Sequence, residues 1–242
     1  MFLRYATCAV LLALPHVGRA QVTIVKSARA ARLTGAPPHI DGVLDDPAWA
    51  QAPVIADFVQ KIPVEGASPS VPTEVRILYD DHGLYVGARL KRPDPSAIRT
   101  SITRRDGDSD AEVFTISLDP YLDRRTAYSF SISSGGVRGD AYHSQDSEDS
   151  GRETQFDPIW SARARVDGEG WTAEMHIPFS QLRFNAAPEL TWGLELTRNV
   201  ADKSERIQWV MIPVSAAGFW HPAAVRARTS TARPALTDFA FM

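Results

Sequence analysis

Cysteine is almost absent from this 242-residue sequence, and its single thiol, Cys8, lies within the first twenty residues. If that stretch is removed, the chain holds no thiol, which excludes disulfides, cysteine-ligated zinc and a cysteine nucleophile. No apolar run after residue 20 is long enough to cross a bilayer as a helix. The chain also lacks a Gly-x-Ser-x-Gly elbow, a His-Glu-x-x-His pair and a glycine-rich phosphate loop before a helix. These absences argue against the common catalytic classes.

An excess of positive charge is missing as well. The chain has 26 Lys and Arg residues against 29 Asp and Glu residues, a formal net charge of −3. No basic stripe with interleaved aromatic residues is present, so nucleic acid is not an expected partner. The carboxylates do not indicate a glycosidase either, because no spacing singles out two that would face each other across a cleft. The residues alone therefore give little support for catalysis.

The first twenty residues have the features of a secretory signal peptide. Arg4 precedes an apolar run over residues 6–14, and Gly18 and Ala20 supply the small residues that a signal peptidase requires. We expect cleavage before Gln21 and export to the periplasm or the extracellular space. Cleavage would remove two arginines and no acid, which leaves 24 basic residues and a net charge near −5. Residues 21–37 would then form an extended N-terminal segment.

Apolar and polar residues alternate with period two over most of the remaining chain, which is typical of half-buried strands. A hairpin closed by the turn at 80–83 would place Tyr79 opposite Leu84 and Val75 opposite Ala88, so that one face stays apolar. The same alternation recurs in Phe114, Ile116 and Leu118, in Tyr128, Phe130 and Ile132, in Trp192, Leu194 and Leu196, and in Ile207, Trp209 and Met211.

A second hairpin is predicted to turn through Gly168 and Glu169. This turn would set Arg163 opposite Glu174 and Ala162 opposite Met175, a register that satisfies both faces of the pair. Polar residues on this and neighbouring strands would either line one concave sheet face or form solvent-facing cross-strand ion pairs: Arg163, Arg165, Glu174, His176, Glu195 and Arg198.

Many short strands with Gly, Pro and Asp turns predict an all-β fold, namely a two-sheet antiparallel β-sandwich, jelly-roll-like, with a few short helices. Helical periodicity is confined to residues 46–51, 94–98 and 178–183. Residues 140–157 are rich in Ser, Asp, Glu and Gln and are predicted to form a long exposed loop. The pattern decays over residues 216–242, which we interpret as an irregular or truncated C-terminal tail.

Two segments carry a family resemblance, IDGVLDDPAW at residues 40–49 and GWTAEMHIPF at 170–179. With them the chain resembles the family 9 carbohydrate-binding modules, in the form found at the front of large outer-membrane barrel proteins of unknown function. The resemblance covers roughly residues 38–212, and we place the domain at 38–215. Three shorter segments support it: YDDHGLYVG at 79–87, RRD at 104–106 and LRF at 182–184.

The resemblance implies a glycan ligand, non-catalytic binding and a link to carbohydrate catabolism through attached hydrolases. Sugars bind flat aromatic faces with a few polar groups that fix their orientation. Four tryptophans are in phase with apolar neighbours and are expected in the core: Trp49, Trp171, Trp192 and Trp209. Four aromatics at strand ends or in loops are candidate sugar-binding residues: Tyr121, Tyr142, Trp160 and Trp220. The resemblance implies a pair of aromatic side chains that hold a terminal sugar between them, and our preferred pair is Trp160 with Trp220.

Asp106, Asp108 and Asp110 place three carboxylates at alternate positions, which is a pattern that calcium ligands can share. The segment is not an EF-hand, because Ala111 replaces the required glycine. A solvated acidic turn is the alternative. Structural calcium is known in the family that the chain resembles, so a calcium site stays among our expectations.

Two alternatives to sugar binding remain open. The chain could be a periplasmic interaction domain of a truncated outer-membrane barrel protein, with outer-membrane components as its partners. It could also be a haem-binding redox domain on the same sandwich, with Met175 or Met211 as a ligand. Both methionines are in phase with core residues, which favours a packing role for them.

Overall fold

Strands and short 3-10 helices form the regular structure of the part of the chain that the computed structural model describes. That part comprises residues 26–107, 110–145, 151–153, 155–185, 187, 190–214 and, for the backbone alone, 239–241. The signal peptide predicted at residues 1–20 lies outside it and stays a prediction. No helix in these ranges is long and apolar enough to span a membrane.

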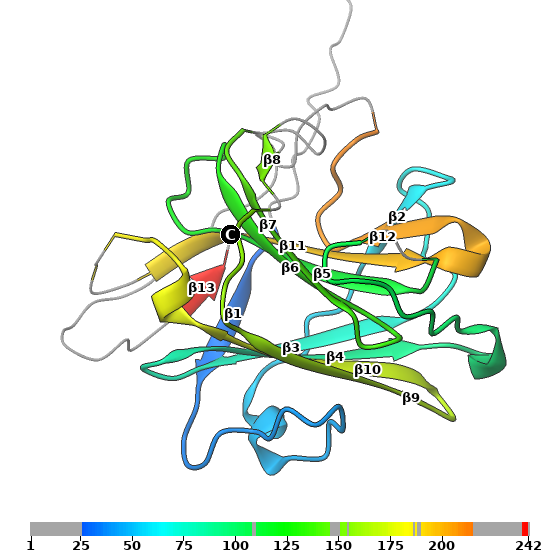
Figure 1. The fold of residues 1–242 in the computed structure, drawn as a ribbon, viewed down its shortest axis with the longest axis horizontal. Helices are drawn as coiled ribbons and strands as arrows, with labels where there is room; N and C mark the ends of the chain where they lie inside the picture. Colours follow the sequence, from blue (N-terminus) through cyan, green and yellow to red (C-terminus); the bar gives the residue numbers. More distant parts are fainter. Residues whose placement is uncertain are drawn as a thin grey trace, which may run out of the picture.

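The strands form two layers that face each other, which confirms the predicted β-sandwich (Figure 1). Sheet I has the order β1-β3-β4-β10-β9, and sheet II has the order β8-β7-β6-β5-β11-β12-β2. The strands of sheet I are β1 (Ala28–Arg32), β3 (Thr73–Tyr79), β4 (Gly83–Lys91), β9 (Ser161–Asp167) and β10 (Gly170–Pro178). Those of sheet II are β2 (Val59–Ile62), β5 (Val113–Asp119), β6 (Ala127–Ser133), β7 (Arg138–His143), β8 (Arg152–Glu153), β11 (Leu190–Val200) and β12 (Glu205–Gln208).

A strand at the C-terminus joins the two sheets. β13 (Phe239–Phe241) pairs antiparallel with β1 of sheet I and parallel with β11 of sheet II. The backbone of residues 239–241 is therefore regular, within a tail that the sequence pattern predicts as irregular.

The core lies between the sheets and is filled by the inward-facing residues of each strand. Both predicted hairpin registers are confirmed: Tyr79 pairs with Leu84, and Arg163 pairs with Glu174. All four tryptophans predicted for the core are at most 3% exposed: Trp49, Trp171, Trp192 and Trp209. Period-two burial thus determines both the register and the contents of this core.

Buried charges tie the two sheets together at one end of the sandwich. Arg198 of β11 donates to the carbonyls of Pro72 and Lys91, at the ends of β3 and β4, and to Glu112 at 2.9 Å. The same Glu112 oxygen accepts the indole N–H of Trp171 from β10 at 2.9 Å. Arg198 and Glu112 are both at most 1% exposed, so this pair is shielded from solvent.

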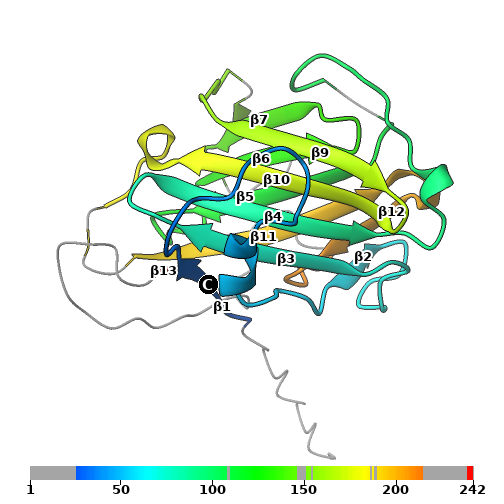
Figure 2. The ribbon, with the colours of Figure 1, turned by 90° about the horizontal axis from the view of Figure 1, so that it is seen from below.

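The outer face of sheet I is covered by the segment that precedes β2. Figure 2 shows this segment, drawn in blue, crossing in front of sheet I. Glu174 of β10 accepts the backbone N–H groups of Asp41 (3.0 Å) and Gly42 (2.8 Å) and the indole N–H of Trp49 (3.0 Å). Trp49 lies in the 3-10 helix η1 (Pro47–Gln51) and packs on Leu78 and Tyr85. The two segments that carry the family resemblance therefore bind each other.

Gly42 is required at the centre of this contact. Its φ of +92° favours glycine, and a Cβ there would meet the carbonyl carbon of Ala164 at 3.3 Å. The hydroxyl of Thr172 also donates to the Gly42 carbonyl at 2.6 Å. We call Glu174, Thr172, Asp41, Gly42 and Trp49 the clasp. The clasp therefore covers the part of the outer face of sheet I around Glu174.

Three sequence predictions differ from the structure. The predicted helical pieces are shorter 3-10 turns: η1, η2 (Pro95–Ala97) and η3 (Phe179–Gln181), to which η4 (Ala201–Lys203) is added. The predicted loop at 140–157 is wrong at its start, because β7 runs to His143 and Asp140 is 2% exposed. Of the polar residues expected on an open face or in solvent, Glu174, Glu195 and Arg198 are at most 2% exposed.

Candidate functional site

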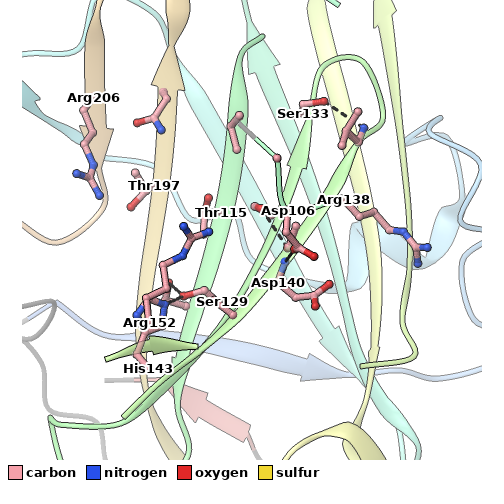
Figure 3. Close-up of a pocket in the computed structure, with 18 residues that line it drawn as sticks. Asp106, Thr115, Ser129, Ser133, Arg138, Asp140, His143, Arg152, Thr197 and Arg206 are labelled. Carbon is pink, nitrogen blue, oxygen red and sulfur yellow. Dashed lines mark hydrogen bonds between the residues drawn. The ribbon is translucent and has the colours of Figure 1, made fainter. Parts of the chain in front are cut away.

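A pocket of about 400 Å³ lies on the outer face of sheet II, which is within the range of small-ligand sites (Figure 3). Its floor consists of the outward-facing residues of β5, β6, β7 and β11, which alternate with the core residues of the same strands. Six of these residues carry hydroxyl groups: Thr115, Ser117, Ser129, Ser131, Ser133 and Thr197.

The strand registers place these hydroxyls side by side. Ser117 pairs with Ser129 across β5 and β6, and Thr115 pairs with Thr197 across β5 and β11. The Ser117 and Ser129 hydroxyls are 2.8 Å apart, and Ser129 Oγ lies 2.9 Å from His143 Nε2. This row of donors and acceptors can exchange hydrogen bonds with a polyhydroxylated ligand.

Charged groups lie on two opposite sides of the pocket (Figure 3). The guanidinium groups of Arg152 and Arg206 lie on one side, where His143 also lies, and the carboxylates of Asp106 and Asp140 lie on the other. Arg138 also lines the pocket, but its guanidinium donates to the carbonyl of Trp160 and its Cζ lies 5.6 Å from the centre of that indole ring.

The acidic side is held by Arg105 of the RRD segment. Arg105 donates to Asp140 Oδ1 at 2.6 Å, and the same oxygen accepts the indole N–H of Trp160 at 2.9 Å. Asp106 accepts the backbone N–H of Asp140 at 2.7 Å and takes a left-handed φ of +60°. Burial raises the pKa of Asp140, although Trp160 and Arg105 oppose this effect. These contacts fix the loop before β5 against β7.

Trp160, one member of the preferred pair, lies in the core and is 4% exposed. Its ring packs edge-on against Phe130 with 5.2 Å between ring centres. Neither face of this indole is open to a sugar in the described structure. Trp220, the other member, lies outside the described residues, so the predicted pair stays untested.

Tyr121 and Tyr142, the other predicted aromatics, lie near one end of sheet II. Tyr121 is 43% exposed in the turn after β5, where Asp119 accepts its backbone N–H at 3.1 Å. Tyr142 is half-buried and packs against Tyr128 with 5.1 Å between ring centres. Burial raises the pKa of Tyr142, and the nearby Asp123 and Tyr121 raise it further. Neither tyrosine is among the residues that line the pocket.

The predicted calcium ligands are only partly described. Asp106 lines the pocket, Asp108 lies outside the described residues, and the side chain of Asp110 is 59% exposed, 3.5 Å from Arg99. Within the described ranges, no three His, Cys, Asp or Glu side chains are grouped so as to hold a metal ion. Calcium remains a prediction.

The pocket residues were visible in the sequence but not identified as a site. Ser129, Ser131 and Ser133 alternate with the core residues of β6, so they were expected on its outer face. No pattern indicated that Arg152 and Arg206, 54 positions apart in the numbering, would line one pocket with them. Only the topology of sheet II, in which β8 and β12 flank the central strands, brings these side chains together.

The fold is a jelly-roll-like β-sandwich with a pocket on the outer face of sheet II. The chain matches the family described as carbohydrate family 9 binding domain-like over residues 40–225, and it belongs to that family. Among curated proteins, none matches it.

Solved structures share this fold at low sequence identity. A family 9 carbohydrate-binding module from Caldicellulosiruptor kristjanssonii, solved with glucose, is 17% identical with a TM-score of 0.54, and the match covers 85% of this chain and 100% of that chain. A module of the same family and organism, solved with cellotriose, is 18% identical with a TM-score of 0.50, covering 74% and 83%. A Bacteroides uniformis protein is 14% identical with a TM-score of 0.59, covering 88% and 97%.

Proposed function

We propose that this chain is a non-catalytic module that binds a carbohydrate in the pocket on the outer face of sheet II. The observation that carries the proposal is the row of hydroxyl groups on this face, since a sugar ring offers matching donors and acceptors. Family membership and the sugar-bound structures of similar fold support it. The described lining contains no Phe, Tyr or Trp, so hydrogen bonds rather than ring stacking would hold the sugar.

The test is a double variant that removes hydroxyls without changing side-chain shape. Thr115→Val and Thr197→Val lie opposite each other on β5 and β11, and valine suits a strand. Calorimetric titration with glucose, cellobiose and xylo-oligosaccharides should show binding to the natural chain that weakens roughly tenfold or more in the variant. Thr191→Val is the control, because Thr191 also lies on β11 but outside the pocket.

Two results would count against the pocket. Unchanged affinity in the double variant would place the sugar elsewhere, and weaker binding in Tyr121→Ala would then point to that exposed tyrosine. Quenching of tryptophan fluorescence that is lost in Trp220→Ala would restore the predicted role of that indole. Absence of binding to any sugar would reject the proposal as a whole.

We further propose export of the chain, on the strength of the basic, apolar and small-residue order over residues 1–20. Mass spectrometry of the protein from its native host should find Gln21 at the N-terminus. A link to carbohydrate catabolism and a structural calcium ion remain proposals of the same kind, and sugar binding with and without a chelator tests the second.

The two alternative functions also keep their tests. Co-purification with outer-membrane components in the absence of sugar binding would favour the interaction domain. A Soret band in the absorption spectrum would favour the haem domain. Met175 is fully buried on the inner face of β10, where it packs in the core, and Met211 is half-buried. The burial of Met175 makes the haem domain the weaker of the two alternatives.

A further inference from the structure

We infer that the pocket selects a sugar that carries an anionic group, a uronic acid or a sulfated sugar, through Arg152 and Arg206. This inference rests on the proposed sugar binding at the same pocket. Its starting point is the charge of the pocket lining, which is unequal on the two sides.

The positive side is built by strands from opposite parts of sheet II. Arg152 lies on β8, at one edge of the sheet, and Arg206 lies on β12, beyond the central β5 and β11. His143 of β7 pairs directly with Arg152 in the β7–β8 register. Figure 3 shows Arg152 and His143 beside Ser129, and Arg206 on the same side of the pocket beyond Thr197.

The two carboxylates of the described lining are paired with an arginine outside the pocket lining. Asp140 and Asp106 lie on the far side of the pocket, where Arg105 contacts them at 2.6 Å and 4.0 Å. No ion pair among the described residues involves Arg152, whose side chain is exposed to solvent. The guanidinium of Arg152 lies beside the hydroxyl groups of the pocket, where it can bind an anionic group of a ligand.

Glu195, a buried acid of the neighbouring strand β11, interacts electrostatically with Arg206. Glu195 of β11 is 2% exposed, and burial raises its pKa to about 8 although Arg206 acts to lower it. The neutral form of its carboxyl group therefore predominates at pH 7.

A carboxylate or sulfate group suits this arrangement, because guanidinium groups form paired, charge-assisted hydrogen bonds with planar or tetrahedral oxyanions. The hydroxyls of Thr115, Ser129 and Thr197 would contact the ring, and the arginines would contact the anionic substituent. A neutral hexose could use only the first set of contacts. The structures of similar fold were solved with neutral sugars, glucose and cellotriose.

The experiment compares sugars that differ in one group. Glucose, glucuronic acid and glucose 6-sulfate are titrated calorimetrically against the natural chain, Arg152→Gln and Arg165→Gln at low and high salt. Arg165 is exposed on β9 outside the pocket, so its variant makes the same change in net charge at a distant place. Arg206→Gln is a second variant, and thermal melting confirms that each variant is folded.

We expect the natural chain to bind one or both anionic sugars roughly 10- to 100-fold more tightly than glucose, with a preference that weakens as salt rises. Arg152→Gln should lose that preference and keep its affinity for glucose, while Arg165→Gln keeps both. Relative affinities of glucuronic acid and glucose 6-sulfate distinguish carboxylate from sulfate recognition.

Three results would overturn the inference. Glucose that binds as well as both anionic sugars would reject anion selection while the proposed function stands. Equal losses in Arg152→Gln and Arg165→Gln would attribute the preference to net charge and not to the pocket. No binding of any of the three sugars would reject the proposed function together with the inference.

Discussion

Glu174 shows how much of this fold depends on a single buried side chain. It lies on the outer face of β10, where a carboxylate would ordinarily face water, and three donors of the segment at 41–49 surround it. Burial raises its pKa, and the hydrogen bonds from Gly42, Asp41 and Trp49 oppose that effect. The residue therefore joins two distant parts of the chain and is absent from the pocket lining.

Replacing Glu174 with alanine should destabilise the protein without altering the pocket. The variant leaves the N–H groups of Asp41, Gly42 and Trp49 without their acceptor. Gly42 and Trp49 are buried, and an unsatisfied buried donor costs about 1–3 kcal/mol, so we expect a loss of about 2–6 kcal/mol. Urea unfolding measures it. Glu169→Ala, an exposed acid in the turn before β10, is the control and should change stability little. Equal effects in the two variants would contradict the role of the clasp.

At the scale of elements, the strands with alternating apolar residues were predictable because their burial follows directly from the sequence period. The pairs of β3 with β4 and of β9 with β10 follow from turns a few residues long. β7 was not predictable, since Asp140 and His143 are buried on account of partners far along the chain, Trp160 and Ser129. Trp160 is likewise buried because of distant partners, since its indole N–H donates to Asp140 and its ring packs on Phe130.

Some features of the pocket were predictable from the sequence, and others were not. The hydroxyls of β5 and β6 were expected on an outer face, because their strands alternate. Which outer face carries the pocket was not predictable, since that depends on the clasp covering part of sheet I. The position of the two arginines depends on the strand order of sheet II, which no local pattern specifies.

Glu195 connects β11 to the bend after β12 and should make the stability of that connection depend on pH. Its Oε1 accepts the backbone N–H groups of Trp209 (3.1 Å) and Val210 (3.3 Å). Burial raises its pKa to about 8, from the ordinary glutamate value of 4.5. Between these two pH values the folded state holds a proton that the unfolded state has released. Stability therefore falls as pH rises through this window, by up to about 1.4 kcal/mol per pH unit, and levels off above it.

Glu195→Gln should remove this dependence, because the amide oxygen can accept the same hydrogen bonds without a titrating proton. We expect the stability of the natural chain relative to the variant to be greatest near pH 5 and to decline toward pH 8. Urea unfolding of both proteins across that range measures the difference, in which the other carboxyls cancel. A difference that is constant with pH would contradict the prediction.

At the scale of the whole molecule, the two layers are connected by different means at different places. β13 joins the sheets through backbone pairing with β1 and β11. The Arg198–Glu112 pair joins them through buried side chains, and Arg92 adds a contact to Glu112 at 3.3 Å and to Asp202 at 2.7 Å. These charges are compensated only while both sheets are in place.

Arg198→Met should therefore destabilise the sandwich strongly. It leaves the buried carboxylate of Glu112 with less compensation, and breaking a buried pair from one side costs about 3–5 kcal/mol. The double variant Arg198→Met with Glu112→Gln should recover part of the loss, as measured by urea unfolding. Arg125→Met, at an exposed turn, is the control. A small effect of Arg198→Met alone would mean that the core replaces this ion pair readily.

The clasp has a consequence for comparisons among proteins of this family. Its glycine, glutamate and tryptophan secure the scaffold from the side opposite the pocket, so relatives recognised by these residues can be expected to share an architecture and still differ in ligand preference. Ligand classes would be sorted better by the outward positions of β5, β6, β8 and β12. The same separation makes the pocket a suitable region for redesign, because residues there can be exchanged without altering the contacts of the clasp on the opposite sheet.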